Sequence, residues 1–197
     1  LADWAKIPER SQLSIAVNVS AVQFRQEDFV DEVRQVLRAT SIDPSLLIVE
    51  VTESVLMDNP EQVRTILSEL RGLGIQVALD DFGTGYSSLN YLKKLPLDRL
   101  KIDRSFVAGI PEESADVAIA ETILNLAHNL GLQVIAEGVE TEAQSTWLRS
   151  RGCTGFQGFL FGRPVPVDQL RIPAQLQTTP SRTQLDAARV GAADPTG

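Results

Sequence analysis

Six short apolar runs in this 197-residue sequence each end in an acid, an amide or an amine. Five of the runs are near-continuous stretches of aliphatic residues, which is typical of parallel strands buried on both faces of a sheet. Their polar last residues are Asn18, Glu50, the pair Asp80 and Asp81, Lys101 with Asp103, and Glu137, and a sixth run ends at Gln157. A buried carboxylate is costly unless it is paired or bound to a cation, and α/β barrels carry their catalytic groups at this end of the strands. The pattern therefore predicts a ring of functional side chains at one edge of a parallel sheet.

Composition excludes several classes of protein. The sequence has 18 basic and 26 acidic residues, a net charge of −8, which disfavours binding to long nucleic acid or to anionic lipid. A single cysteine excludes an internal disulfide framework and suits a reducing compartment. No apolar run approaches the roughly 20 residues of a membrane span, so we expect no direct membrane insertion. We expect a cytoplasmic protein, either free or the cytoplasmic domain of a larger membrane-bound protein.

Helical patterns alternate with the strand patterns along the chain. Residues 26–40 place apolar side chains, Val36 among them, on one helical face. Asn59 before Pro60 predicts the start of another helix, and residues 141–144 form a capping box for a third. Successive strand-helix units predict a parallel α/β domain, for which a closed eight-stranded barrel needs two strands more than this sequence supplies.

The last part of the sequence differs from the rest. Beyond residue 171 it is rich in Pro, Thr, Ser, Ala and Gly and has little apolar periodicity. We therefore expect one barrel domain over residues 1–171 and a flexible tail over residues 172–197. An incomplete barrel leaves two sheet edges unpaired, so we also expect a homodimer or association with other domains.

The adjacent acids Asp80 and Asp81 carry the strongest chemical signal. Two neighbouring carboxylates at a strand end ionise at little cost only near a cation, and one or two divalent metals would supply it. Oxygen ligands without a histidine cluster favour Mg²⁺ or Mn²⁺ over zinc. The alternative is that both acids merely cap the following loop and helix. Lys101, flanked by apolar residues in a buried strand, needs a negative partner, which these acids would provide.

Six motifs between Leu13 and Val167 have the order and spacing of the EAL-domain family, which this sequence resembles. The motifs are Asn18-Val19-Ser20, Glu50-Val51-Thr52-Glu53-Ser54, Asp80-Asp81-Phe82-Gly83-Thr84-Gly85-Tyr86-Ser87-Ser88, Lys101-Ile102-Asp103, Glu137-Gly138-Val139-Glu140 and Gln157-Gly158-Phe159. The resemblance implies a TIM-like (β/α) barrel, of which about six of the eight strands are present. It also implies a cyclic-di-GMP phosphodiesterase that hydrolyses cyclic di-GMP to linear pGpG by metal-activated water, with Mg²⁺ or Mn²⁺ as cofactor.

The resemblance assigns a role to each motif residue. It implies as metal ligands Asn18, Glu50, Asp80, Asp81 and Glu137. The catalytic residues would be Lys101, which orients the attacking water, together with Asp81 and Glu137. Support for the substrate or the site would come from Gln157, Asp103, Arg163 and Pro164. Glu53 would anchor the loop that starts at Asp80.

One departure from the family leaves two hypotheses open. The Glu-Ala-Leu tripeptide that names the family, whose glutamate is a metal ligand, is absent, as is the arginine that follows it. We therefore expect this chain to be the carboxy-terminal portion of such a domain, without its first two strands. The first hypothesis is an active phosphodiesterase. The alternative is a catalytically impaired module that binds cyclic di-GMP or contacts a protein partner.

Overall fold

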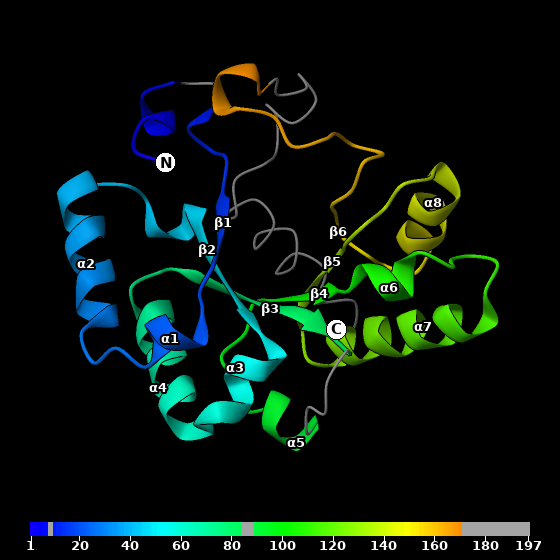
Figure 1. Ribbon diagram of the computed structural model, residues 1–197, viewed down its shortest axis with the longest axis horizontal. Coiled ribbons are helices and arrows are strands. Elements are labelled where there is room, and N and C mark those ends of the chain that lie inside the picture. Colours follow the sequence, from blue (N-terminus) through cyan, green and yellow to red (C-terminus); the bar gives the residue numbers. More distant parts are fainter. Residues whose placement is uncertain (8–9, 84–88, 171–197) are drawn as a thin grey trace, which may run out of the picture.

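A computed structural model describes residues 1–7, 10–83 and 89–170 of the chain. At its centre lies one sheet of six parallel strands, in which neighbours in the sheet are also neighbours in the sequence (Figure 1). The strands are β1 (Ile15–Asn18), β2 (Leu47–Thr52), β3 (Gln76–Phe82), β4 (Arg99–Ile102), β5 (Gln133–Ala136) and β6 (Gly155–Phe156). This curled sheet is half of a barrel, so the predicted fold with six strands is confirmed.

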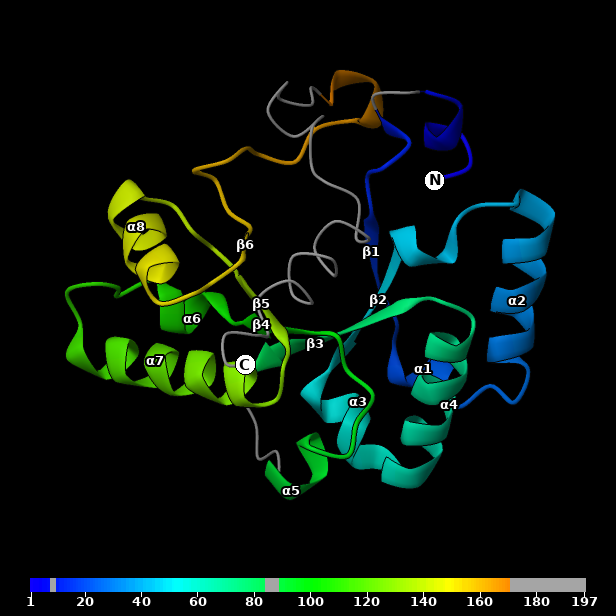
Figure 2. The ribbon, with the colours of Figure 1, turned by 180° about the vertical axis from the view of Figure 1, so that it is seen from behind.

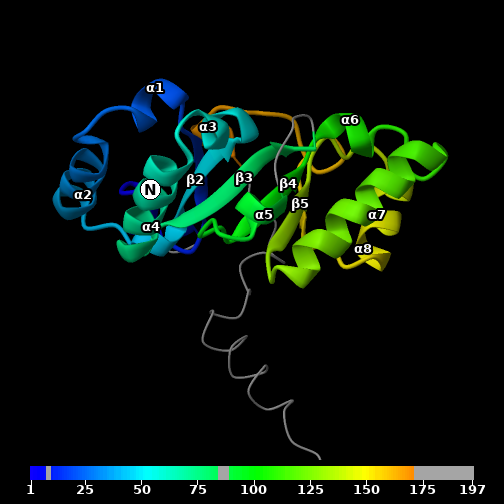
Figure 3. The ribbon, with the colours of Figure 1, turned by 90° about the horizontal axis from the view of Figure 1, so that it is seen from below.

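Eight α-helices connect the strands in the described part of the chain. They are α1 (Ala21–Phe24), α2 (Phe29–Thr40), α3 (Glu53–Asp58), α4 (Pro60–Gly72), α5 (Leu89–Leu92), α6 (Arg104–Val107), α7 (Ser114–Asn129) and α8 (Glu142–Ser150). Short 3₁₀ turns are η1 (Trp4–Lys6), η3 (Pro44–Leu46) and η4 (Val167–Gln169). The helices α1 to α4 group beside β1 to β3, and α6 to α8 group beside β4 to β6, as Figures 2 and 3 show. The apolar core lies between these helices and the sheet.

The concave side of the half-barrel borders a hollow of about 560 Å³. Its lining comes from β1, β2, β4, β5 and β6 and from the residues that flank them, including Glu50 and Gln157 at the carboxyl ends of their strands. Of the polar residues predicted at the strand ends, Glu50 and Gln157 line this hollow.

Two burial predictions are wrong. The first strand was expected to be buried on both faces, but Val17 is 44% exposed. The strand β1 lies at the sheet edge, where it pairs with β2 alone, whereas β2 to β5 each have two neighbours. Val36 is also exposed, because α2 buries a face that contains Phe29, Val30 and Leu37 instead.

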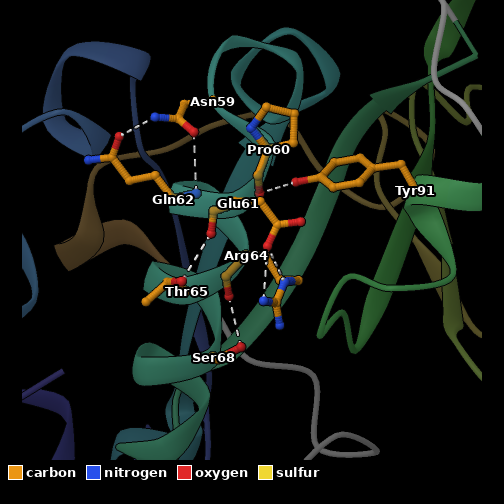
Figure 4. Close-up of polar contacts among 8 residues, drawn as sticks. All are labelled: Asn59, Pro60, Glu61, Gln62, Arg64, Thr65, Ser68 and Tyr91. Carbon is orange, nitrogen blue, oxygen red and sulfur yellow. Dashed lines mark hydrogen bonds and ion pairs between the residues drawn. The ribbon is translucent and has the colours of Figure 1, made fainter.

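The predicted helix start at Asn59 and Pro60 is confirmed as the start of α4. A side chain of α5 forms a hydrogen bond with the first turn of this helix (Figure 4). The Asn59 side chain accepts a hydrogen bond from the Gln62 amide, at 3.4 Å, and Pro60 occupies the first turn of α4. The Tyr91 hydroxyl, from α5, donates to the Pro60 carbonyl. This bond ties α5 to the first turn of α4.

The predicted tail lies outside the described residues, so the domain boundary near residue 171 stays a prediction. Among the helices of the described ranges, none combines the length and the apolar character needed to cross a bilayer.

Candidate metal-binding and catalytic site

The strand register places the first predicted ligands on one face of the sheet. Asn18 pairs with Glu50 across β1 and β2, and Thr52 pairs with Asp80 across β2 and β3. Because paired residues and residues two positions apart share a face, Asn18, Glu50 and Asp80 all face the same side. Glu50 and Asp80 are buried there, at 7% and 8% exposure, whereas Asn18 is exposed at the sheet edge. The register therefore places these three residues on one face of the sheet, whereas the convergence of Asn18 with the two acids stays a prediction.

A bulge between β3 and β4 lets two successive acids reach the site. In a regular strand Asp80 and Asp81 would point to opposite faces. The register instead shifts between Leu79 and Phe82, so that both acids lie opposite the single residue Lys101. Asp81 takes up the extra residue with a left-handed backbone, at φ 53°. Bulges of this kind change the direction of a side chain next to functional sites.

Three carboxylates come together as a result. Asp80, Asp81 and Glu137 each offer an oxygen, and these oxygens lie within 4.8 Å of one another. Hard oxygen donors at this spacing suit Mg²⁺ or Mn²⁺, which prefer carboxylate ligands. The residues present therefore fit a divalent cation of this class.

Lys101 is the buried counter-charge of the site. Its Nζ lies 3.0 Å from Glu50 Oε2, 3.0 Å from Asp80 Oδ1 and 2.6 Å from Glu137 Oε1. Burial alone would lower the pKa of Lys101, but the hydrogen bonds that its ammonium donates to Glu137, Glu50 and Asp80 outweigh burial and raise the pKa above its ordinary value. Lys101 is therefore an ammonium at neutral pH. Three carboxylates, those of Glu50, Asp80 and Glu137, are the negative partners that the sequence predicted for it.

Two of the acids hold their protons more strongly than usual. Burial raises the pKa of Asp81, and the negative charges of Asp80 and Asp103 raise it further. Burial also raises the pKa of Glu137, although Lys101 opposes the shift. Both shifts express the cost of crowding carboxylates in a partly buried space, a cost that a bound cation would relieve.

Asp103 has a structural task that its place in the motif did not reveal. Its carboxylate caps α6 by accepting hydrogen bonds from the amide of Ser105, at 2.9 Å, and from the Ser105 hydroxyl. Burial would raise the pKa of Asp103, but these bonds outweigh it and hold the pKa below its ordinary value. An aspartate directly after a strand is a residue type that favours the N-cap of a helix, so the sequence does contain a signal for this role.

The remaining predicted residues lie toward β6 and beyond it. Gln157 lines the hollow together with Glu50. Arg163 and Pro164 are exposed, and the Arg163 guanidinium stacks over Phe159, 4.3 Å from the ring centroid. Gln157 thus shares the site's hollow, whereas the contact of Arg163 is to its own segment and its role in the site stays a prediction.

The expected loop anchor can be followed only in part. Glu53 is 5% exposed and begins α3 directly after β2. Its expected partners are backbone groups from Gly83 to Ser87, of which all but Gly83 lie outside the described residues. Gly83 has φ 99°, and a Cβ there would come within 2.9 Å of the Phe106 ring, so this turn requires glycine. The anchoring role of Glu53 stays a prediction.

One contact at the rim of the site has no counterpart in the sequence pattern. Arg104 Nη2 lies 2.9 Å from Glu140 Oε1, between the segments that follow β4 and β5. The two residues are 36 positions apart, and neither shows a signal that would pair them.

Comparison with known proteins agrees with this geometry. The family model described as "EAL domain" matches residues 1–164. Over 169 residues, the chain is 48% identical to the bifunctional diguanylate cyclase/cyclic di-GMP phosphodiesterase MucR of Pseudomonas aeruginosa, covering 86% of this chain and 23% of that protein. The chain spans between 20% and 27% of the length of the curated relatives it matches.

Solved structures extend the likeness to the fold. The structure described as "PaMucR Phosphodiesterase, c-di-GMP complex" has a TM-score of 0.81 and 47% identity, over 85% of this chain and 68% of that one. The manganese and cyclic di-GMP complex of Klebsiella pneumoniae BlrP1 has a TM-score of 0.74 and 34% identity, over 83% of this chain and 42% of that one. This chain belongs to the EAL domain family.

Proposed function

We propose that this chain is a cyclic-di-GMP phosphodiesterase domain that hydrolyses one phosphodiester of cyclic di-GMP and yields linear pGpG. The observation that carries the proposal is the cluster of Asp80, Asp81 and Glu137, whose oxygens lie within 4.8 Å of one another beside the buried Lys101. The phosphodiesterase MucR, at 48% identity, supports the choice of substrate. The setting we propose is the cytoplasm, where this nucleotide would be the partner.

The carboxylates would hold Mg²⁺ or Mn²⁺, as one or two ions. Asp80, Asp81 and Glu137 are the inner ligands in this proposal, with Glu50 and Asn18 from the neighbouring strands completing the set. A divalent ion in such a site neutralises phosphate charge and lowers the pKa of a bound water. The family's first-strand glutamate is not in this sequence, so the set proposed here is the part of the site that this chain supplies.

Lys101 would orient the attacking water, and Asp81 would accept its proton. Lys101 keeps its proton because three carboxylates surround it, and an ammonium held in this way can donate a hydrogen bond to a water that displaces one of them. Asp81 would accept the proton of that water as a general base. Gln157, at the mouth of the hollow, would support the bound nucleotide.

The open edges of the sheet favour a second candidate function, that of a binding module without catalytic turnover. The described sheet has six strands, and the strands β1 and β6 at its edges each have a single neighbour. A chain with this open sheet could bind cyclic di-GMP or a second domain without turnover, and unpaired strand edges favour a homodimer or association with other domains.

The decisive experiment is chromatographic. The purified chain is incubated with cyclic di-GMP and Mn²⁺, and we expect pGpG to accumulate with the wild-type chain. Asp80→Asn should abolish product, whereas Glu142→Gln, an exposed acid at the start of α8, should leave the rate unchanged. Tight nucleotide binding by calorimetry without product would favour the binding module. Absence of both nucleotide binding and product would overturn the phosphodiesterase and the nucleotide-binding module alike.

A further inference from the structure

The turn that carries Glu137 is fixed on both sides by neighbouring strands. The Glu137 amide donates to the carbonyl of Ile102, at 3.1 Å, and the Val139 amide donates to the carbonyl of Gln157, at 3.0 Å. Between these two bonds Gly138 adopts a left-handed backbone, at φ 65°. The direction of the Glu137 side chain therefore depends on how this turn is held.

A side chain from α6 lies directly over the turn. A Cβ placed on Gly138 would come within 2.8 Å of the Cβ and Cδ atoms of Arg104, so the stem of Arg104 occupies the space that any larger residue would need. Beyond the glycine, the guanidinium of Arg104 pairs with Glu140, at 2.9 Å. The Arg104 side chain thus extends across the turn at Gly138, and its guanidinium pairs with Glu140 beyond it.

A buried glutamine makes a second tie between the same two segments. Gln144 is 5% exposed, and its Nε2 donates to the carbonyls of Val107 and Ala108, at 3.2 and 3.3 Å, at the end of α6. Its Oε1 accepts from the amide of Glu140, at 2.8 Å. The main chain of Glu140 is therefore tied to α6 through Gln144, and its side chain is tied to α6 through Arg104.

We propose that Arg104 is a positioning residue for Glu137, acting through its ion pair with Glu140 across Gly138. The inference rests on the proposed function, because it concerns the aim of one carboxylate of that site. Glu137 must point toward Asp80 and Asp81 for their oxygens to lie within 4.8 Å of one another. The Arg104–Glu140 pair fixes the turn from which Glu137 points.

The ion pair itself contributes little to global stability. The side chains of Arg104 and Glu140 are 64% and 43% exposed, and exposed pairs stabilise a fold by at most about 1 kcal/mol. Loss of the pair should therefore be visible at the site and nearly invisible in thermal unfolding.

Charge and position predict opposite effects on metal affinity, which makes the proposal testable. Removing the positive charge of Arg104 near an acidic site would, through Coulomb's law alone, strengthen the binding of a divalent cation. Loss of positioning would weaken it, because Glu137 would no longer be held in place. The sign of the change decides between the two effects.

The experiment measures Mn²⁺ affinity by titration calorimetry on the full chain, without substrate. We expect Arg104→Ala and Glu140→Gln each to weaken Mn²⁺ binding about tenfold, the lower end for residues that orient metal ligands. The double variant should be no weaker than either single variant, because both remove one interaction. Arg104→Lys, which keeps a cation and an alkyl stem, should restore most of the affinity.

The control is Arg151→Ala, which removes an arginine that directly follows α8 and pairs with Glu121 of α7, at 2.7 Å. Its Mn²⁺ affinity should equal that of the wild-type chain. Equal or tighter Mn²⁺ binding by Arg104→Ala, with the wild-type chain binding normally, would overturn the positioning role alone. A wild-type chain that binds no Mn²⁺ would instead overturn the proposed function, and the inference with it.

Discussion

The ammonium of Lys101 lies 2.6 Å from the carboxylate of Glu137, the residue that directly follows the neighbouring strand β5. Glu50 and Asp80 contact the same ammonium from two further strands. One buried cation therefore links the ends of four strands, yet the carboxylates around it outnumber it. The site keeps negative charge for a divalent cation, and this balance leads to the first prediction.

Lys101→Met should destabilise the chain strongly in the absence of metal. The change leaves three carboxylates without their cation, and breaking a buried pair in this way typically costs about 3–5 kcal/mol. Urea unfolding should report the loss, and saturating Mn²⁺ should recover a larger part of it than the same Mn²⁺ adds to the wild-type chain. Lys94→Met, at an exposed position, is the matched control. A loss no greater than that of the control would contradict the role of Lys101 as counter-charge.

Two substitutions at Asp81 should separate the effect of its backbone conformation on stability from the effect of its charge on metal binding. Asp81 has φ 53°, a conformation that glycine adopts freely and that costs alanine about 1–2 kcal/mol. Asp81→Gly should therefore be more stable than Asp81→Ala by about this amount. Both variants lack the carboxylate, so both should lose Mn²⁺ affinity to the same extent. Equal stability of the two variants would show that the left-handed conformation at this position is not required.

Much of the fold could be predicted because its determinants are local. Aliphatic runs predicted the positions of five strands and a further apolar run ending at Gln157 predicted the sixth, while the cap at Asn59 and the box at residues 141–144 predicted two helix starts. The prediction for β1 was wrong in its burial, since an apolar run looks the same at the edge of a sheet as at its centre. Val36 was misplaced because two overlapping faces of α2 are apolar, and tertiary packing chose the other one.

The candidate site could be predicted as a set of residues but not as an arrangement. Parallel strands bring their carboxyl ends together, which is why the residue types alone brought Glu50, Asp80 and Glu137 into one group. The shift in register that turns Asp81 toward the same side depends on the pairing of two strands, which no local pattern encodes. The Arg104–Glu140 contact likewise depends on how α6 packs against the turn after β5.

The attachment of α5 to α4 can be tested at Tyr91. Tyr91→Phe removes the hydroxyl that donates to the Pro60 carbonyl and should lower the free energy of unfolding by about 1 kcal/mol. Amide hydrogen exchange of residues 89–92 should also become faster, since the bond holds α5 in place. Unchanged exchange in this helix would show that apolar packing of the Tyr91 ring alone holds it.

The buried thiol of Cys153 predicts a dependence of stability on pH. Cys153 is 6% exposed, and burial raises its pKa to about 11. A thiol in the unfolded chain ionises near 8.5, so the unfolded state loses its proton first as the pH rises. The contribution of Cys153 to stability is therefore complete below about pH 8.5 and is lost progressively as the pH rises toward 11.

The measurement compares the wild-type chain with Cys153→Ala, which has no thiol. Both proteins should lose stability between pH 8 and pH 10.5 through their other titrating groups, and the wild-type chain should lose more. Iodoacetamide at pH 8 should label Cys153 in urea far faster than in buffer, because the thiolate is the reactive form and the folded chain suppresses it. If the two proteins lost equal stability and labelling in buffer were fast, the thiol would have to be accessible and ordinary in its pKa, in conflict with its burial and with its contact with the Val134 carbonyl.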